Sequence, residues 1–325
     1  MAKNGRFSAF KKAHVHKNDE ANEVLQKLRD FLDANEPGLV HLLVTTWRTQ
    51  GKAITYKEIR EAILAGDITT QYLEDWIQDY NRFVIRYMQP AWENAMAEAA
   101  AEIAATHPGW RFAPYADGVR MWTEQRAASF VTNVTQTQVE GLRAVIRQAA
   151  AANQMGVDDL ARAVRPMVGL TKPQAVANMN YYQRLIDNGT PVKKAQDLSM
   201  RYAARQHRYR GYNIARTELA NAYNQGAYEG TKQAQKAGYM GPSYKIWCTA
   251  DDERVCPVCG DLDGKKIPLD DDFDFRTNLD TVANPTIRKM PPAHPSCRCA
   301  AIIREDRPRK KSPYKITRTV IEDDE

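Results

Sequence analysis

The sequence has no long apolar run. The longest candidate covers residues 38–47 and contains His41, and it is far shorter than the roughly 20 residues that span a bilayer. Residues 1–20 are polar and contain no apolar stretch of the kind that directs export. We therefore expect a soluble chain without a membrane segment, made in a reducing cytoplasm.

Cysteine is absent from the first 247 residues, and all five cysteines lie in the last quarter of the chain together with His294. The order is Cys-x-x-Cys and, after a long insertion, His-x-x-Cys-x-Cys. Zinc prefers four thiolate or imidazole donors, often supplied in closely spaced pairs. The spacing therefore predicts a structural zinc ion held by Cys256, Cys259, Cys297 and Cys299, with His294 as the alternative to Cys299.

Other uses of these cysteines stay open at this stage. A redox pair normally opens a helix beside a parallel strand, whereas residues 260–264 after Cys259 predict a turn. A disulfide requires an oxidising compartment, which the absence of an export signal disfavours. Plain buried thiols are a further alternative.

Acidic residues are missing from 201–216, although the net charge of the whole chain is only +6. Tyrosines alternate with arginines in this segment, and such side chains grip phosphates and stack on bases. The basic tail, residues 304–325, is expected to be an extended arm. The alternative for 201–216 is a solvated helix face with inward tyrosines. The candidate nucleic-acid contacts are Arg201, Arg205, Arg208, Arg210, Lys310 and Lys311.

The fold class predicted from these patterns is α+β. Apolar residues recur at helical spacing to about residue 237, after which short β-branched segments and polar loops take over. The predicted organisation is a flexible N-terminus (1–20), a helical N-terminal region (21–120), a second helical region (121–240), a small cysteine-rich β-containing module (241–303) and a charged tail (304–325).

Local signals set the helix boundaries. Pro37 and Gly38 predict the end of the first helix, and Pro90 predicts a kink or break within 70–106. Capping pairs predict that helices begin at Thr55 with Glu58, Thr135 with Gln138, and Thr171 with Gln174.

The C-terminal module is predicted to contain three strands, at 244–249, 265–268 and 300–303. A module of about 70 residues has a thin apolar core and usually needs a metal or a cross-link. This is the physical reason to assign the cysteines a stabilising role.

Three stretches together resemble a known family. Residues 214–221 read Ile-Ala-Arg-Thr-Glu-Leu-Ala-Asn, residues 247–265 contain Asp-Glu-Arg, Cys-x-x-Cys and Leu-Asp-Gly in that order, and residues 291–299 end in His-x-x-Cys-Arg-Cys. This order resembles the phage Mu F-like head morphogenesis proteins over roughly residues 130–303. The first 120 residues carry no matching motif.

The resemblance implies a non-enzymatic minor head protein of a tailed phage. Its implied partners are the portal protein, other head proteins and packaged double-stranded DNA, with no membrane and no small-molecule substrate. The implied location is the virion, at the capsid interior or the portal vertex, after synthesis in the host cytoplasm.

Two alternative functions are a zinc-ribbon DNA-binding protein and an effector resembling ADP-ribosyltransferases. The latter enzymes use an arginine, a serine or threonine and a glutamate from separated strands. Here Arg216, Thr217 and Glu218 are contiguous on a predicted helix, so we interpret them as a structural ion-pair and capping element. Arg254 and Arg298 lie beside the cysteine pairs, where guanidinium groups can support thiolates or carbonyls.

Overall fold

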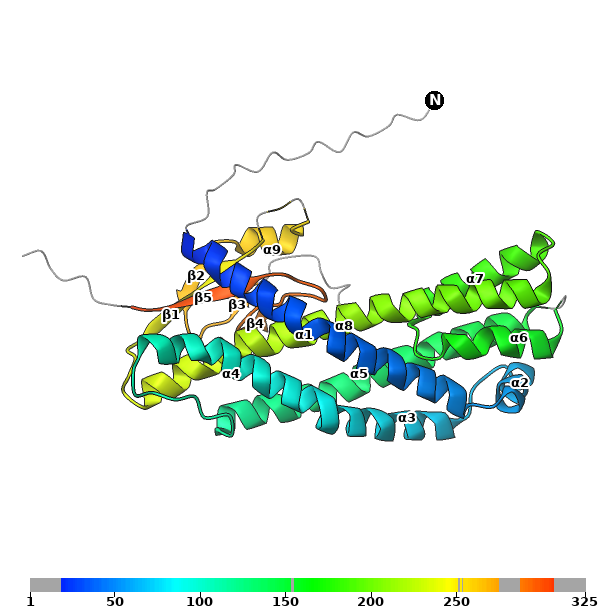
Figure 1. Ribbon diagram of the computed structural model, residues 1–325, viewed down its shortest axis with the longest axis horizontal. Helices are drawn as coiled ribbons and strands as arrows, with labels where there is room; N and C mark the ends of the chain where they lie inside the picture. Colours follow the sequence, from blue (N-terminus) through cyan, green and yellow to red (C-terminus); the bar gives the residue numbers. More distant parts are fainter. Residues whose placement is uncertain (1–18, 153–154, 251, 253, 275–286, 307–325) are drawn as a thin grey trace, which may run out of the picture.

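The computed structural model describes residues 19–152, 155–250, 252, 254–274 and 287–306. Helices build a long body, with a small β-containing module at one end and α2, α6 and α7 at the other (Figure 1). The helical segments are α1 (Asp19–Ala53), α2 (Tyr56–Ala65), α3 (Thr70–Phe83), a π-helix (Val84–Met88), α4 (Gln89–Thr106), α5 (Asp117–Ala150), α6 (Val157–Val164), a 3-10 turn (Arg165–Met167), α7 (Lys172–Asp187), α8 (Val192–Lys236) and α9 (Pro257–Leu262). The predicted α+β class with a mostly helical N-terminal part is confirmed.

The first helix does not end at Pro37, contrary to the prediction from sequence. α1 continues through Pro37 and Gly38 to Ala53. Proline inside a helix costs about 3 kcal/mol, and the apolar face beyond it offsets this cost, since Leu39, Leu43 and Trp47 are buried. Tertiary packing overrides the local signal here.

The predicted break at Pro90 takes the form of a π-helix. α3 ends at Phe83, five residues of π-helix follow, and Pro90 then occupies the first turn of α4, where its missing N–H is tolerated. The chain bends without leaving the helical body. The capping boxes predicted at Thr55 and Thr171 are both present.

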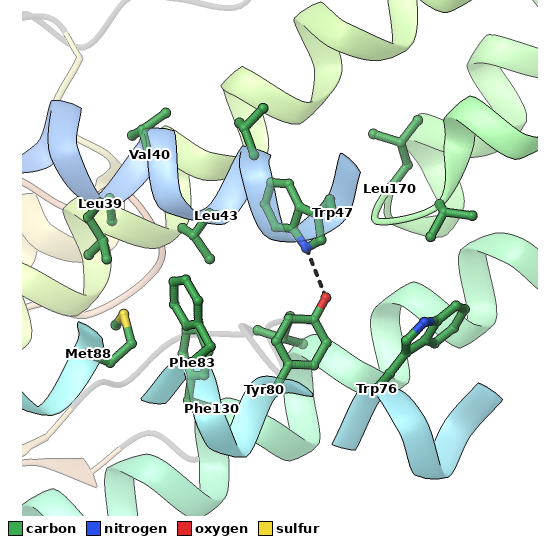
Figure 2. Packing of buried hydrophobic residues seen from close by; sticks show 14 of the residues in the cluster. Leu39, Val40, Leu43, Trp47, Trp76, Tyr80, Phe83, Met88, Phe130 and Leu170 are labelled. Carbon is green, nitrogen blue, oxygen red and sulfur yellow. Dashed lines mark hydrogen bonds between the residues drawn. The ribbon is translucent and has the colours of Figure 1, made fainter. Parts of the chain in front are cut away.

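The third predicted capping pair is wrong. α5 runs unbroken from Asp117 to Ala150, and Thr135 and Gln138 are buried inside it. The hydroxyl of Tyr80 faces the side-chain oxygens of Gln50 and Gln138 as a donor. It accepts a hydrogen bond of 2.9 Å from Trp47 Nε1. Figure 2 shows this Trp47–Tyr80 bond amid Leu43, Phe83 and Leu170. A capping signature thus serves as a polar network in the core.

α8 is the spine of the molecule. Its 45 residues correspond to about 68 Å of helix, and it packs on α4, α1 and α7. Close approach to α4 requires a glycine, because a Cβ at Gly226 would lie 2.3 Å from Met96 Cα. One continuous apolar core runs from Ala21 in α1 to Ile302 in the module.

The module contains an antiparallel sheet in the order β2-β1-β5 and a second antiparallel pair, β3-β4. The strands are β1 (Ser243–Cys248), β2 (Lys266–Pro268), β3 (Phe273–Asp274), β4 (Ile287–Arg288) and β5 (Ala300–Glu305). The three predicted strands are confirmed as β1, β2 and β5. Within the described residues, no helix combines the length and the apolar character needed to cross a membrane.

Candidate metal centre

The first cysteine pair is formed at the start of a short helix. Cys256 is the N-cap of α9, Pro257 occupies its first turn, and Cys256 Sγ accepts the main-chain N–H of Cys259 at 3.4 Å. The predicted turn at 260–264 begins later than expected, at 263–264, because the six residues Pro257–Leu262 are helical. The sheet beside α9 is antiparallel, unlike the parallel strand expected next to a redox pair.

The second donor group lies on the tight turn before β5. Cys297 N–H donates to the carbonyl of His294 at 3.2 Å, and Ser296 between them has a φ of 58°. The left-handed conformation at Ser296 closes the turn so that the side chains of His294 and Cys297 reach toward the first pair. The two donor groups thus meet at the ends of the 34-residue segment between Cys259 and His294.

The donor atoms form two triangles that share Cys259. Cys256, Cys259 and His294 make one group, and Cys259, Cys297 and Cys299 make the other, with all ligand atoms of each group within 4.8 Å of one another. His294 Nε2 lies 3.1 Å from Cys256 Sγ and 3.3 Å from Cys259 Sγ, and Cys259 Sγ lies 3.6 Å from Cys297 Sγ. Zinc–ligand bonds of about 2.0–2.3 Å give tetrahedral edges of about 3.3–3.8 Å, close to these spacings, so the donors suit one small ion.

The surroundings are apolar. Cys259, Cys297 and Cys299 are buried together with Trp247, Leu262 and Phe273, and the rings of Trp247 and Phe273 meet edge to face with centroids 5.0 Å apart. His294 and Cys256 are only partly buried, on the outer side of the cluster. Soft donors in a dry pocket with one open side are a suitable setting for a structural thiophilic ion.

The three buried thiols share their protons. The pKa of Cys297 is lowered well below its usual value by hydrogen bonds from the thiols of Cys259 and Cys299 and from main-chain groups. The pKa of Cys259 is raised in turn, chiefly by its bond with Cys297. The hydrogen bonds from its neighbours thus favour the thiolate form of Cys297, the form that ligates metal.

Both arginines beside the cysteine pairs bind Asp252 instead of a thiolate. Arg298 donates two hydrogen bonds of 2.6 Å to the carboxylate, and Arg254 Nη2 lies 3.3 Å from it. The Arg298 guanidinium holds the pKa of Asp252 well below its usual range. The bidentate pair ties the residue between Cys297 and Cys299 to the loop that precedes Cys256.

Three polar side chains of α8 hold the second donor group. Thr217 Oγ1 accepts the N–H of Ser296 at 2.9 Å, and Asn213 Oδ1 accepts the Ser296 hydroxyl at 2.8 Å. One helical stretch further on, Asn224 donates to the carbonyl of Cys299 and accepts the N–H of Ala301. Thr217 stands out in the sequence only as part of the Arg216-Thr217-Glu218 element, and no motif marks Asn213 or Asn224, although residues 213, 217 and 224 share one helix face at spacings of four and seven.

Each residue of the contiguous Arg216-Thr217-Glu218 element contacts a different part of the molecule. Arg216 binds Glu36 of α1 with two hydrogen bonds of 2.6 and 2.8 Å, while Glu218 accepts two from Arg126 of α5 at 2.6 and 2.7 Å. With Thr217 holding Ser296, three consecutive residues fasten α8 to α1, α5 and the module. The ion-pair part of the interpretation is confirmed, but the capping part is wrong, because Thr217 lies in the interior of α8 and caps no helix end.

The candidate nucleic-acid contacts do not all share one surface. Arg201, Arg205 and Arg208 are exposed on α8. Arg210 is buried and donates to main-chain oxygens of Gly169 and Val134 and to Thr137 Oγ1, so it does not belong to that face. Residues two apart on an α-helix do not lie on the same face, so Arg208 is exposed while Arg210 is buried. The presence of several arginines in one segment does not show which of them face inward. Lys310 and Lys311 lie outside the described residues.

A comparison with models of protein families matches residues 140–302 to the family described as Phage Mu protein F like protein. The match begins in α5 and includes α8, both cysteine pairs and the first half of β5. Searches of curated proteins and of solved structures find no match.

Proposed function

The chain belongs to the phage Mu F-like family, and we propose that it acts as a minor head protein of a tailed phage, in contact with the portal vertex or the capsid interior. The family is one of phage head morphogenesis proteins with a structural role. The observation that carries the proposal is the match over residues 140–302, which includes α8 and the module that it supports.

A phage that lacks the gene tests this role. We expect the protein in purified virions at low copy relative to the major capsid protein, and we expect the deletion to yield defective or non-infectious heads that a plasmid copy restores. Cross-linking and mass spectrometry of intact heads should connect the chain to the portal. Absence from purified virions, together with normal heads after deletion, would contradict the proposal.

We further propose that the cysteine cluster holds one zinc ion with a structural role. The module has small sheets and a thin core. Four soft donors on one ion would link the start of α9, at Cys256 and Cys259, to the turn that precedes β5. Metal analysis of the purified full chain under reducing conditions tests the clip. About one zinc per chain is expected; a metal-free chain with an intact module would contradict it.

A second candidate function is binding of packaged double-stranded DNA, supported by the exposed face of α8. Four cations and a tyrosine lie within about 60° of arc and along about 27 Å of this helix, and we call this set the α8 basic stripe: Lys194, Arg201, Arg205, Arg208 and Tyr212. The four cations form no ion pair with another described residue, whereas most exposed arginines of α3, α5 and α6 are paired.

The length of the α8 basic stripe corresponds to about eight base pairs of DNA at 3.4 Å each. If four phosphates are neutralised, the logarithm of the affinity should fall with the logarithm of the salt concentration at a slope of about −3.6. The triple variant Arg201→Gln, Arg205→Gln, Arg208→Gln should bring this slope toward −1. The matched control removes the same charge from paired arginines, as Arg82→Gln, Arg120→Gln, Arg162→Gln, and should keep it. No binding by the wild type at low salt would exclude this function.

The effector alternative is disfavoured by the contacts of Glu218. Both carboxylate oxygens bind Arg126 of α5, and the Glu218 side chain is buried. Incubation with labelled NAD tests this alternative directly. Label transfer that depends on Glu218 would overturn the non-enzymatic assignment.

A further inference from the structure

The candidate metal centre offers five donors for the four places of a tetrahedral ion. The sequence alone favours four cysteines, with His294 as the substitute. The arrangement of the donor atoms brings His294 into the ligand set, because His294 and Cys256 complete a compact triangle with Cys259, and Cys297 Sγ lies 3.6 Å from Cys259 Sγ. This inference rests on the proposed zinc clip and concerns which side chains form it.

His294 is oriented as a ligand. Its Nδ1 lies 2.9 Å from the carbonyl oxygen of Pro295, and a carbonyl can only accept, so Nδ1 carries the proton of the neutral ring. The lone pair of Nε2 is then free, and it is Nε2 that lies 3.1 Å from Cys256 Sγ and 3.3 Å from Cys259 Sγ. A main-chain acceptor on the far ring nitrogen is the usual support of a metal-binding histidine.

Cys297 supplies the remaining place. The turn His294-Pro-Ser-Cys297 repeats the two-residue gap of Cys256-Pro-Val-Cys259, and Cys297 Sγ lies 3.6 Å from Cys259 Sγ. The sulfur–sulfur edge around zinc is about 3.8 Å. Cys299 stands one extended step further, where β5 begins and its carbonyl is held by Asn224.

We infer that Cys256, Cys259, His294 and Cys297 bind one thiophilic divalent ion through three thiolates and one imidazole, and that Cys299 is a reserve thiol outside the ligand shell. The reserve is in reach, since Cys299 Sγ lies within 4.8 Å of both Cys259 Sγ and Cys297 Sγ. When the imidazole is lost, Cys299 takes its place and the shell becomes four thiolates. The metal is therefore kept through a change in one ligand.

X-ray absorption spectroscopy on the zinc-loaded full chain tests the ligand set. We expect three sulfur neighbours and one nitrogen neighbour in the wild type, and the same shell in Cys299→Ser. His294→Ala should keep the metal with four sulfur neighbours. The double variant His294→Ala, Cys299→Ser should lose affinity by more than the roughly 100-fold that loss of a supporting residue costs.

The outcomes separate the two proposals. A wild-type shell of four sulfurs, or loss of zinc in Cys299→Ser, would overturn this ligand assignment while the zinc clip stands. Loss of zinc in His294→Ala with Cys299 intact would overturn the reserve role. A wild type that binds no zinc would overturn the clip itself. Circular dichroism of each variant, which reports the large helical body, identifies any that fail to fold.

Discussion

The hydroxyl of Thr217 accepts the main-chain N–H of Ser296 at 2.9 Å. This bond joins the middle of α8 to the turn between His294 and Cys297, two of the proposed ligands. Because Arg216 and Glu218 on either side are fixed to α1 and α5, a single helical turn of α8 holds the His294–Cys297 turn in place against the helical body.

Thr217→Val should weaken metal binding without unfolding the helices. The change removes the hydroxyl but keeps the shape, so the Ser296 N–H loses its acceptor, a loss worth about 1–3 kcal/mol when the group is buried. Zinc affinity, measured by competition with a chromophoric chelator, should fall about 10-fold. Thr46→Val is the matched control, since its hydroxyl bonds only to Leu42 of its own helix; equal affinities in the two variants would contradict the anchoring role.

Glu218→Ala should be strongly destabilising. It leaves the Arg126 guanidinium, whose side chain is 24% exposed, without its carboxylate, and breaking a buried pair costs about 3–5 kcal/mol. We expect a loss near 3 kcal/mol in urea unfolding. Glu124→Ala removes the partner of an exposed pair with Arg120 and should change stability by less than about 1 kcal/mol. Similar losses in both would show that the buried pair is not special.

Lys245 should give the module a distinctive pH dependence. Its buried ammonium group donates to the carbonyls of Leu269 and Asp271, and burial lowers its pKa to about 8 from the usual 10.5. Between these values the unfolded chain binds more protons than the folded chain, so the free energy of unfolding rises with pH at up to about 1.4 kcal/mol per unit.

The variant Lys245→Met isolates this contribution from the titration of the cysteines. The wild type should gain stability relative to the variant as pH rises from 8 to 10.5, in chemical unfolding followed by tryptophan fluorescence. A difference that stays constant over this window would contradict the assignment.

Two helical glycines should respond in opposite ways to alanine. A Cβ at Gly226 would lie 2.3 Å from Met96 Cα, whereas one at Gly38 meets nothing within 4 Å. Gly226→Ala should therefore force α8 away from α4 and destabilise by about 1–3 kcal/mol, and Gly38→Ala should stabilise by about 1 kcal/mol. Thermal unfolding measures both; a neutral Gly226→Ala would mean that the α4–α8 packing is looser than described.

Several features of the fold follow from local sequence. The capping boxes at Thr55 and Thr171 form because each needs only four neighbouring residues. Short runs of β-branched residues predict the strands of the module. The spacing of the cysteine pairs predicts that their side chains lie together. These signals are local, and the structure preserves them.

The remaining features depend on partners that are distant in sequence. Thr135 and Gln138 have the spacing of a capping box, but burial against Tyr80 of α3 makes them core residues. α1 continues beyond Pro37 because its apolar face packs on α8. Arg210 points inward because its guanidinium donates to the carbonyls of Val134 and Gly169. The preference for His294 over Cys299 likewise depends on how two turns meet.

The zinc content of the purified full chain, measured together with the number of reactive thiols, tests the central claim most directly. If the cysteine module is a metal clip seated on α8, the native chain should hold about one zinc, and its five cysteines should be largely protected until a chelator is added. Less than about half a zinc per chain, with all five thiols reactive from the start, would contradict the account.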